Sequence, residues 1–280
     1  MTAKNSTNLA VCPDSATDTP THAHVESTLR RVRVVLIGTT HAGNIGAAAR
    51  AMKTMGLTKL MLVEPKAKLD AHAFSMASNA LDVMDAIQRF DDLDGALAGC
   101  HWVIGASARL RDRPHELMSV RQMGEHARTA WLLNPHYPQA EIALVFGREH
   151  SGLTNVELGR CHAHMMIPAN PVYSSLNLAQ AVQIACYELR QALLSDTPIL
   201  PQLESPQPAA HDAVENLLQH WETTLHTLEF LDPQNPRHMM QKLRFLLQRA
   251  QVTPNEVDIL RGMLTAVQRK IRSTGQNHDV

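Results

Sequence analysis

The chain has 280 residues, which predicts about two domains if a domain takes roughly 150 residues. Its 26 Lys and Arg residues balance 27 Asp and Glu residues, and this net charge of -1 excludes a histone-like or polybasic protein while allowing a local basic face. Hydrophobic residues make up 44% of the chain and aromatic residues only 4%, so a sizeable core has to rest mainly on aliphatic side chains and Met.

The first part of the chain predicts an α/β domain. Residues 1–30 are rich in Thr, Ser, Ala and Asp and predict a disordered tail, and the domain is expected to span 31–194. Short apolar strands alternate there with helices, which favours a mostly parallel sheet covered on both faces. We expect strands at 32–38, 59–63, 101–105, 142–146 and 164–167, helices at 44–55, 71–90, 93–98, 120–132 and 175–194, and a charged loop at 106–118.

The second part predicts a small all-α unit. Residues 195–210 contain four prolines and are expected to form a semi-rigid linker. Over residues 211–280, apolar residues recur at spacings of three and four, which predicts three helices. The third helix should begin at Thr253, because Thr253 and Glu256 form a capping box and Pro254 takes the first helical position.

A glycine-rich turn, residues 38–46, follows the first predicted strand. Its glycine spacing (GTTHAGNIG) matches neither a dinucleotide-binding fingerprint nor a P-loop, which leaves a tight turn and a helix cap as one reading. Asn44 is expected near the helix start, where its side chain can cap the helix. Arg50 lies either on the surface or in a cleft where its guanidinium meets a phosphate.

Two further turns are dense in Gly, Pro, Asn and Ser. Residues 144–153 (LVFGREHSGL) form either a plain β-turn or a ligand-binding loop, since ligands usually bind at the carboxyl ends of parallel strands. In residues 167–183 (IPANPVYSSLNLAQAVQ), Ser174, Ser175 and Asn177 stand before a helix. They either cap that helix or hold a ligand together with its free backbone N–H groups.

Together the three turns resemble the motifs of a known family. The patterns are N-x-G-x-x-x-R at 44–50, F-G-x-E-x-x-G-L at 146–153 and I-P-x-N…S-S-L-N-L at 167–178. Over about residues 31–192 their order and spacing are similar to the SpoU/TrmH family, the SPOUT-class RNA 2'-O-ribose methyltransferases. The resemblance implies an α/β domain that ends in a deep trefoil knot, forms a homodimer and binds S-adenosylmethionine.

The resemblance also implies site residues by motif position. A slot lined by small residues and backbone suits an adenine ring. The residues expected to contact S-adenosylmethionine are Ala106, Ser107, Ala108, Gly147, Ile167, Ser174, Ser175 and Leu176.

The catalytic residues are carried over in the same way. Arg50 matches the family's essential arginine, and we expect it to hold the adjacent phosphate and polarise the ribose hydroxyl, since a guanidinium is a poor base. The residues expected to orient the reacting groups are Asn44, Glu149, Ser175 and Asn177.

Longer segments narrow the expected substrate. HAGNIGAAARAMKTMGL, GREHSGLTNVEL and the helical tail are similar to bacterial members that methylate cytidine or uridine ribose at nucleotide 32 of the tRNA anticodon loop. An rRNA 2'-O-methyltransferase and a catalytically inert RNA-binding homologue are the alternatives. The intact Asn44, Arg50 and Glu149 argue against inertness.

The C-terminal unit carries a basic stretch. Residues 237–272 contain eight Lys or Arg residues and two acidic ones, Glu256 and Asp258, which leaves a local charge of +6. Such a stretch is either a solvated helical face or a surface for RNA phosphates, and the near-neutral charge of the whole chain favours the second reading. We predict RNA contacts at Arg50, Lys242, Arg244, Arg249 and Arg261.

We expect no metal and no membrane span. Cys161, His162 and His164 supply too few ligands for a metal site. No apolar run approaches the roughly 18 residues of a membrane span, and the start lacks the apolar segment of a signal peptide. A soluble cytoplasmic protein is expected, with reduced thiols at Cys12, Cys100, Cys161 and Cys186.

Overall fold

Seven strands form one parallel sheet in the part of the chain that the computed structural model describes, residues 22–107, 116–195, 206–231 and 237–275. Their order is β3-β2-β1-β6-β4-β7-β5, and all six strand pairings are parallel. The α/β class with a mostly parallel sheet is therefore confirmed. The strands are β1 (Val32–Ile37), β2 (Lys59–Val63), β3 (Gln88–Phe90), β4 (Cys100–Ala106), β5 (Glu116–Ser119), β6 (Glu141–Phe146) and β7 (Ala163–Met166).

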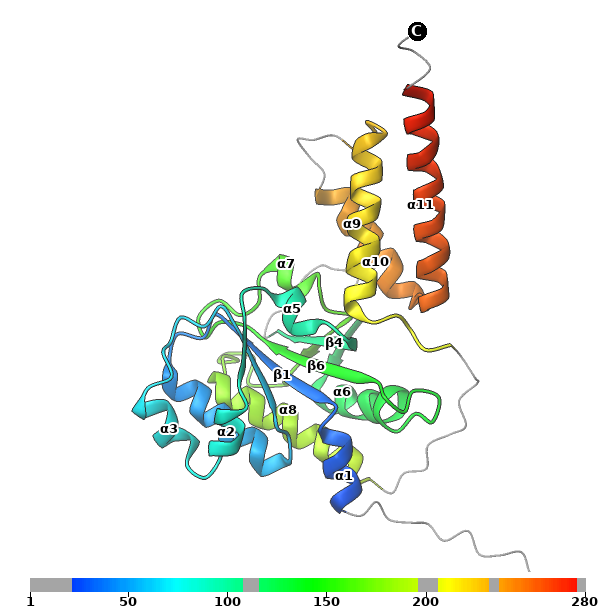
Figure 1. The fold of residues 1–280 in the computed structure, drawn as a ribbon. Coiled ribbons are helices and arrows are strands. Elements are labelled where there is room, and N and C mark those ends of the chain that lie inside the picture. Colours follow the sequence, from blue (N-terminus) through cyan, green and yellow to red (C-terminus); the bar gives the residue numbers. More distant parts are fainter. Residues whose placement is uncertain (1–21, 108–115, 196–205, 232–236, 276–280) are drawn as a thin grey trace, which may run out of the picture.

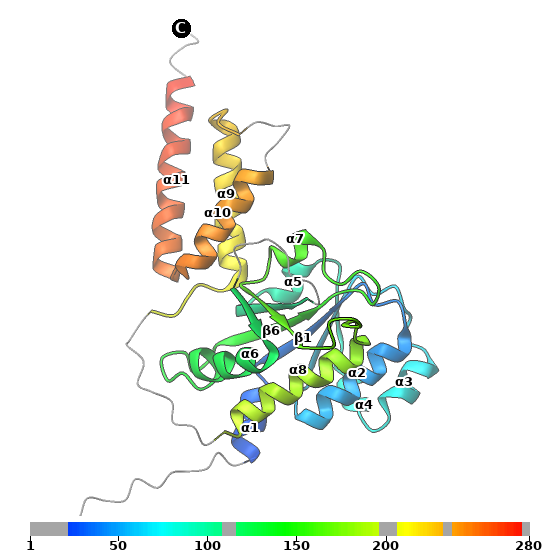
Figure 2. The same cartoon turned by 180° about the vertical axis from the view of Figure 1, so that it is seen from behind.

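Helices cover both faces of this sheet (Figure 1, Figure 2). They are α1 (His22–Leu29), α2 (Ala42–Met55), α3 (Ala71–Ala77), α4 (Leu81–Asp85), α5 (Leu93–Leu97), α6 (Val120–His126), the π-helix η1 (Ala127–Leu132), α7 (Asn155–Leu158) and α8 (Leu178–Leu193). Side chains of a strand alternate between the two faces, so β1 contributes to two cores. Leu36 packs in the larger core with α2, α6 and α8, and Ile37 in the smaller core with α5 and α7.

The N-terminal segment is more ordered than predicted. Residues 22–29 form α1, which buries Val25 and Leu29 in the larger core, so the expected disordered tail is wrong for these residues. Two apolar residues four apart place both side chains on one helix face, and packing against the domain supplies the stability that the short helix lacks by itself. Residues 1–21 lie outside the described part of the chain.

Two other predictions for this domain are wrong. Residues 71–90 do not form one helix but α3, α4 and the edge strand β3, because Ser78 takes a left-handed φ of 53° that ends α3. The stretch predicted as a charged loop ends in β5, which pairs with β7 and buries Met118. A strand of four residues has too short an apolar pattern to be recognised in the sequence.

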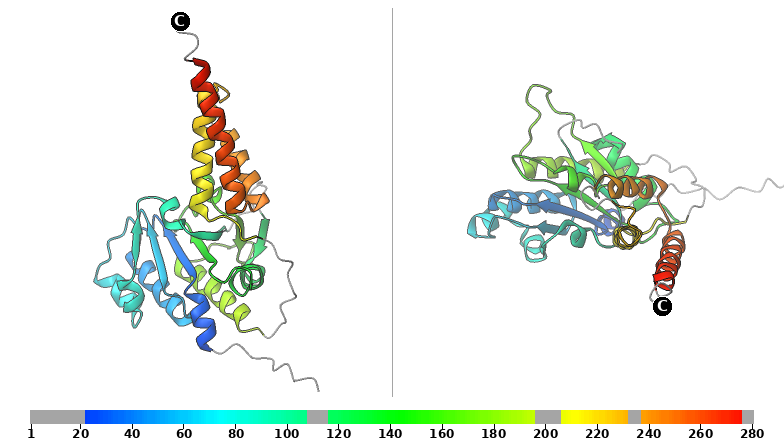
Figure 3. Two further views of the ribbon diagram at one scale, coloured as in Figure 1. Left: turned by 45° about the vertical axis from the view of Figure 1, so that its right-hand side comes forward. Right: turned by 90° about the horizontal axis from the view of Figure 1, so that it is seen from above.

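The C-terminal unit consists of α9 (His211–Thr227), α10 (Arg237–Ala250) and α11 (Pro254–Gly275) among the described residues. These helices share a core of their own that includes Leu217, Leu247 and Val257. The predicted capping box is present, since the Thr253 N–H donates to the Glu256 carboxylate and the Glu256 N–H donates to Thr253 Oγ1. Figure 3 shows the unit projecting from the α/β domain.

The structure describes part of the segment that joins the two units. Residues 196–205 of the predicted linker lie outside the described residues. After them, the Ala209 N–H donates to the carbonyl of Val252 and ties the chain to the start of α11. None of the described helices combines the length and the apolar character needed to cross a bilayer.

Candidate active site

The loops that follow β1, β4, β6 and β7 meet at one edge of the sheet. In a parallel sheet the carboxyl ends of adjacent strands lie together, and these four strands are neighbours in the sheet order. An inner cavity of about 250 Å³ opens among the loops. It is lined by every described residue expected to contact the cofactor: Ala106, Ser107, Gly147, Ile167, Ser174, Ser175 and Leu176. Ala108 lies outside the described residues.

Main chain forms much of one wall of the inner cavity. The backbone groups of Arg148 and Gly152 pair with each other, which brings the chain at Gly147 close to Gly152. A Cβ atom on Gly147 would lie 2.1 Å from the carbonyl carbon of Gly152, so only glycine fits there. A slot with main-chain and small-residue walls suits an adenine ring, the use that the family resemblance implies for these residues.

A larger and more open cavity, of about 740 Å³, adjoins the inner one. Its lining includes His41, Asn44 and Asn177. Glu149 and His150 line both cavities, so a group held in the inner cavity and one held in the outer cavity meet beside these two residues.

Hydrogen bonds join three loops around Glu149. Asn44 Nδ2 donates to Glu149 Oε1 at 3.0 Å, and Asn177 Nδ2 donates to Asn44 Oδ1 at 3.0 Å. Thr40 donates to the same carboxylate through its backbone N–H and its hydroxyl. Asn177 also caps α8 by accepting from the Ala179 N–H. The predicted residues Asn44, Glu149 and Asn177 therefore form one rigid network.

The network keeps Glu149 ionised. Burial by itself raises the pKa of this carboxyl group, but hydrogen bonds from Asn44 and Thr40 outweigh burial and lower the pKa from 4.5 to about 2. A carboxyl group with a depressed pKa in the folded state stabilises the fold above its ordinary pKa, and this contribution is lost as the pH falls through the lowered pKa.

Glu149→Gln is therefore expected to lower the stability of the protein at pH 7. The difference in stability between the variant and the unmodified protein should shrink as the pH falls from about 4.5 toward 2. Thermal unfolding measured over this pH range checks the trend. Glu26→Gln, at an exposed position on α1, is the control and should follow the unmodified protein. A difference between Glu149→Gln and the unmodified protein that stays constant down to pH 2 would contradict the role assigned to the charge.

Arg50 stands apart from this network. It is exposed, and among the described residues it has no hydrogen-bond or ion-pair partner. Residues three and seven apart share a helix face, so Arg50 lies on the face of α2 that carries Gly43 and Ala47, two residues of the outer cavity. Arg50 itself lines neither cavity, and its side chain is exposed to solvent.

The predicted RNA-binding residues divide into two groups. Lys242 and Arg249 are exposed on α10, and Arg261 is exposed on α11. Arg244 is not on an open face, which corrects its prediction: it pairs with Glu215 of α9, and its side chain is 16% exposed. Burial lowers the pKa of Arg244 to about 10.

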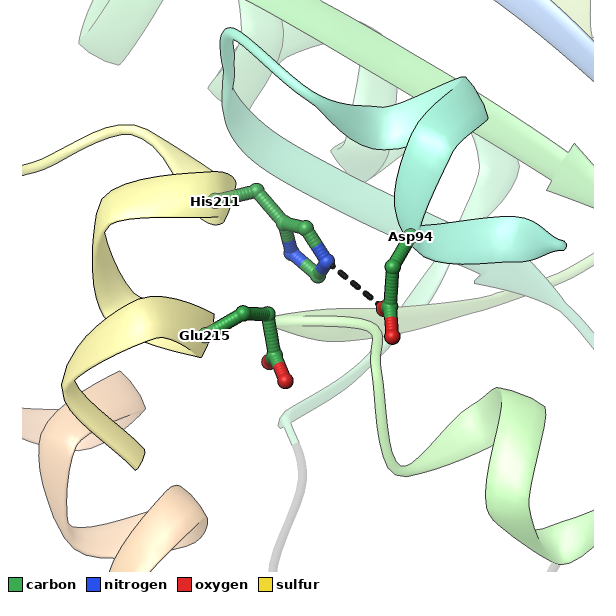
Figure 4. A group of neighbouring side chains, drawn as sticks. All are labelled: Asp94, His211 and Glu215. Atoms are coloured by element: carbon green, nitrogen blue, oxygen red, sulfur yellow. Dashed lines mark hydrogen bonds and ion pairs between the residues drawn. The ribbon is translucent and has the colours of Figure 1, made fainter. Parts of the chain in front are cut away.

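The partners of Arg244 belong to a polar cluster between the two units (Figure 4). His211 Nε2 lies 3.0 Å from Asp94 Oδ1, and Arg160 pairs with Asp94 at 3.1 Å and with Glu215 at 2.8 Å. Asp94, His211 and Glu215 lie close enough to hold a metal ion. The guanidinium groups of Arg160 and Arg244 already neutralise the two carboxylates, so this cluster serves as an interdomain contact and we expect no metal there.

Two residues at the centre of the site were not singled out in the sequence. Thr40 and His41 directly precede the helix that carries Asn44, and the turn after β1 brings both against Glu149. In the sequence, only the position of Thr40 and His41 next to the first motif could have indicated that they belong to the site. A contact between residues more than 100 positions apart in the sequence needs the fold to reveal it.

Both units of the chain match families of known proteins. Residues 31–187 match the SpoU rRNA Methylase family, and residues 212–276 match the family described as tRNA methyltransferase TrmJ, C-terminal domain. The tRNA (cytidine/uridine-2'-O-)-methyltransferase TrmJ of Yersinia pestis (strain Pestoides F) is 46% identical over 247 residues, which cover 86% of this chain and 93% of the relative.

Solved structures agree with these matches. TrmJ from Z. mobilis ZM4 is 28% identical with a TM-score of 0.73, and the match covers 84% of this chain and 98% of that one. A probable methylase family protein from Haemophilus influenzae Rd KW20 is 42% identical with a TM-score of 0.56, and the match covers 88% and 99% of the two chains.

Proposed function

The chain belongs to the SpoU methylase family, and on this basis we propose that it methylates the 2'-hydroxyl of cytidine or uridine ribose in tRNA, at nucleotide 32 of the anticodon loop. The observation that carries the proposal is the pair of adjoining cavities that meet at Glu149. One suits a nucleoside cofactor, and the other is open enough for a nucleotide of a larger substrate. The match of the C-terminal unit and the name of the 46% identical relative favour tRNA over rRNA.

S-adenosylmethionine is the proposed cofactor, and the residues of the inner cavity fit it. When bound, it supplies a methyl group activated by a positively charged sulfur. Gly147 would let the main chain approach the cofactor closely, while Ile167 and Leu176 would offer apolar contacts to its adenine ring. Ser174 and Ser175 offer hydroxyl and backbone groups for its polar atoms.

The outer cavity is the proposed place of the target nucleotide. Asn44 and Asn177 are held by their mutual hydrogen bond and by Glu149, so they can orient a ribose without first becoming ordered. Ser175 lines the inner cavity and is proposed to position the reacting groups from the cofactor side. Arg50 is proposed to hold the phosphate next to the target ribose with its planar guanidinium.

We also propose that the domain is knotted and acts as a homodimer, as its family implies. The strand order supports the knot, because β6 lies between β1 and β4, and β7 lies between β4 and β5, so each enters between strands that precede it in the chain. Knots are rare in proteins, and neither composition nor periodicity indicates one.

The proposed function is tested by methyl transfer from tritium-labelled S-adenosylmethionine to bulk tRNA and, separately, to rRNA. We expect label in tRNA, and digestion followed by mass spectrometry should place 2'-O-methylcytidine or 2'-O-methyluridine at nucleotide 32. Label in rRNA alone would support the rRNA alternative. Absence of label from both RNAs would leave the catalytically inert homologue as the better description.

The exposed cations of α10 and α11 are proposed to contact tRNA phosphates. Combined reversal of Lys242, Arg249 and Arg261 to Glu is expected to weaken tRNA binding at least about tenfold and to reduce the slope of log Kd against log salt by up to about 3, because each lost phosphate contact removes about one released counterion. Fluorescence anisotropy over a range of KCl concentrations measures both effects. Arg121→Glu on α6, where the side chain is 80% exposed, serves as the control. An unchanged slope in the triple variant would refute this contact surface.

A further inference from the structure

We propose that His41 accepts the proton that the ribose 2'-hydroxyl gives up during methyl transfer. This inference rests on the proposed function and supplies a proton acceptor that the predicted residues do not provide. A guanidinium does not lose its proton in proteins, and the amide groups of Asn44 and Asn177 are very weak bases. Glu149 is ionised, but its carboxylate oxygens already accept hydrogen bonds from Thr40, His41 and Asn44, and the same bonds lower its pKa to about 2, which makes it a poor proton acceptor. An imidazole, in contrast, has a free lone pair near neutral pH and is the commonest general base in enzymes.

His41 has the position that this role requires. It directly precedes α2 and lines the outer cavity. Its side chain is 64% exposed, so a nucleotide in the cavity can reach the ring. Its neighbour Glu149 lines both cavities, which places the imidazole beside the point where cofactor and target nucleotide are proposed to meet.

The hydrogen bonds around the ring determine which nitrogen carries the lone pair. Thr40 Oγ1 lies 3.0 Å from Glu149 Oε2, and an ionised carboxylate only accepts, so the Thr40 hydroxyl donates its one proton there. Thr40 Oγ1 also lies 2.9 Å from His41 Nδ1, where it can now act only as the acceptor. His41 Nδ1 therefore carries the hydrogen, and Nε2 carries the lone pair.

The lone pair of Nε2 is available to a substrate. Among the described residues, none forms a hydrogen bond with His41 Nε2. The other side of the ring is held through Thr40 to the Glu149 carboxylate, an arrangement that fixes the ring and the tautomer in the way a carboxylate partner orients a catalytic histidine. Thr40 and Glu149 are thus positioning residues for His41.

Several charged or titratable groups lie around His41. The carboxylate of Glu149 lies 3.6 Å from Nδ1, and His41 stands at the N-terminus of α2. The ring centroid of His150 lies 6.2 Å away, and His72, Lys68 and Asp70 line the same cavity. The nearest full charge is that of Glu149, so the imidazolium formed in the step is stabilised by direct electrostatic attraction.

The proposed step balances without a further reactant. As the ribose oxygen forms a bond to the methyl carbon, the carbon–sulfur bond of the cofactor breaks and its electron pair stays on sulfur, which becomes a neutral thioether. The hydroxyl proton passes to Nε2 of His41. The imidazolium then releases this proton to water through the open side of the cavity.

His41→Gln tests the proposal, because glutamine keeps a polar side chain of similar size but is not a base. In single-turnover reactions with bulk tRNA, we expect the methyl-transfer rate to fall about 10²–10⁴-fold, the usual contribution of a general base. The dissociation constants of tRNA and of S-adenosylmethionine should change less than about twofold.

A second readout does not depend on activity. In ¹⁵N NMR spectra of the cofactor-free protein with labelled histidine, the resonances that disappear in His41→Gln should show Nδ1 protonated and Nε2 unprotonated above neutral pH. His24→Gln, at an exposed position on α1, is the matched control and should leave the rate unchanged. Imidazole added to His41→Gly should restore part of the lost rate.

The outcomes separate this inference from the proposed function. If the unmodified protein methylates tRNA and His41→Gln does so at a similar rate, the inference is overturned and the function stands. A loss of rate in His150→Gln with none in His41→Gln would assign the base to His150 instead. A protonated Nε2 in the cofactor-free protein, or a variant defect confined to tRNA affinity, would also refute the proposal. If the unmodified protein transfers no methyl group, both the function and the inference fail.

Discussion

Arg50→Ala is expected to lower the turnover of tRNA methylation by at least about 10²-fold while leaving the affinity for S-adenosylmethionine unchanged. Turnover and cofactor affinity should respond differently because Arg50 lies apart from the proposed cofactor site. Arg50 lines neither cavity, and about 9 Å of helix rise lies between it and Asn44. Removing its side chain therefore leaves the inner cavity intact and takes away only the group proposed to hold the substrate phosphate.

Arg50→Lys distinguishes charge from geometry. A lysine keeps the positive charge but lacks the planar pair of donors that a guanidinium offers to a phosphate, so we expect a rate between those of Arg50→Ala and the unmodified protein. Methyl transfer under saturating cofactor gives the rates, and isothermal titration gives the cofactor affinity.

Lys53→Ala is the control for a lost cation on the same helix. Lys53 lies one turn beyond Arg50 and pairs with Asp82 at 2.7 Å, where it serves the contact between α2 and α4. Its removal should change the methyl-transfer rate less than about threefold, since a surface ion pair contributes little to stability. Retained turnover in Arg50→Ala would contradict the role proposed for Arg50.

The sequence predicts the centre of the sheet better than its margins. The runs that form β1, β2 and β6 are mostly apolar and rich in branched side chains, because both faces of these strands are covered by helices. At the margins, β3 is a three-residue edge strand and β5 follows a charged stretch, so neither has a pattern long enough to recognise. The turn at Ser78 was missed because a serine with positive φ leaves no sequence signal.

The candidate site was accessible in the sequence only through its resemblance to a family. Helix capping and turn chemistry account for Asn44 and Asn177 one at a time, but nothing in the spacing of residues 44, 149 and 177 requires that they form one hydrogen-bonded network. Arg244 shows the converse, because its place in a basic stretch predicts exposure whereas the fold pairs it with Glu215. The tautomer of His41 depends on three residues from two distant segments and has no sequence signature.

Gly147→Ala is expected to weaken S-adenosylmethionine binding by at least about 10²-fold and to destabilise the domain by about 1–3 kcal/mol. The added methyl group would lie 2.1 Å from the carbonyl carbon of Gly152 and 2.3 Å from the nitrogen of Leu153. Both are main-chain atoms, so the clash cannot be relieved by rotation of a side chain. The segment has to move, and with it the pairing between Arg148 and Gly152.

Displacement of this segment should reach both cavities. Glu149 lies between Arg148 and Gly152 and accepts hydrogen bonds from Thr40 and Asn44, so a shifted segment would disturb the network as well as the wall of the inner cavity. Isothermal titration with S-adenosylmethionine measures the loss of affinity, and thermal unfolding measures the loss of stability.

Gly262→Ala provides the matched control for Gly147→Ala. Gly262 is exposed on α11, and a Cβ atom there meets nothing within 4 Å. Alanine is favoured over glycine inside a helix by about 1 kcal/mol, so this variant should be slightly more stable and should bind the cofactor unchanged. If Gly147→Ala also bound S-adenosylmethionine with unchanged affinity, the inner cavity would not be the cofactor site, because main chain at position 147 cannot accept a Cβ atom without altering the cavity that it lines.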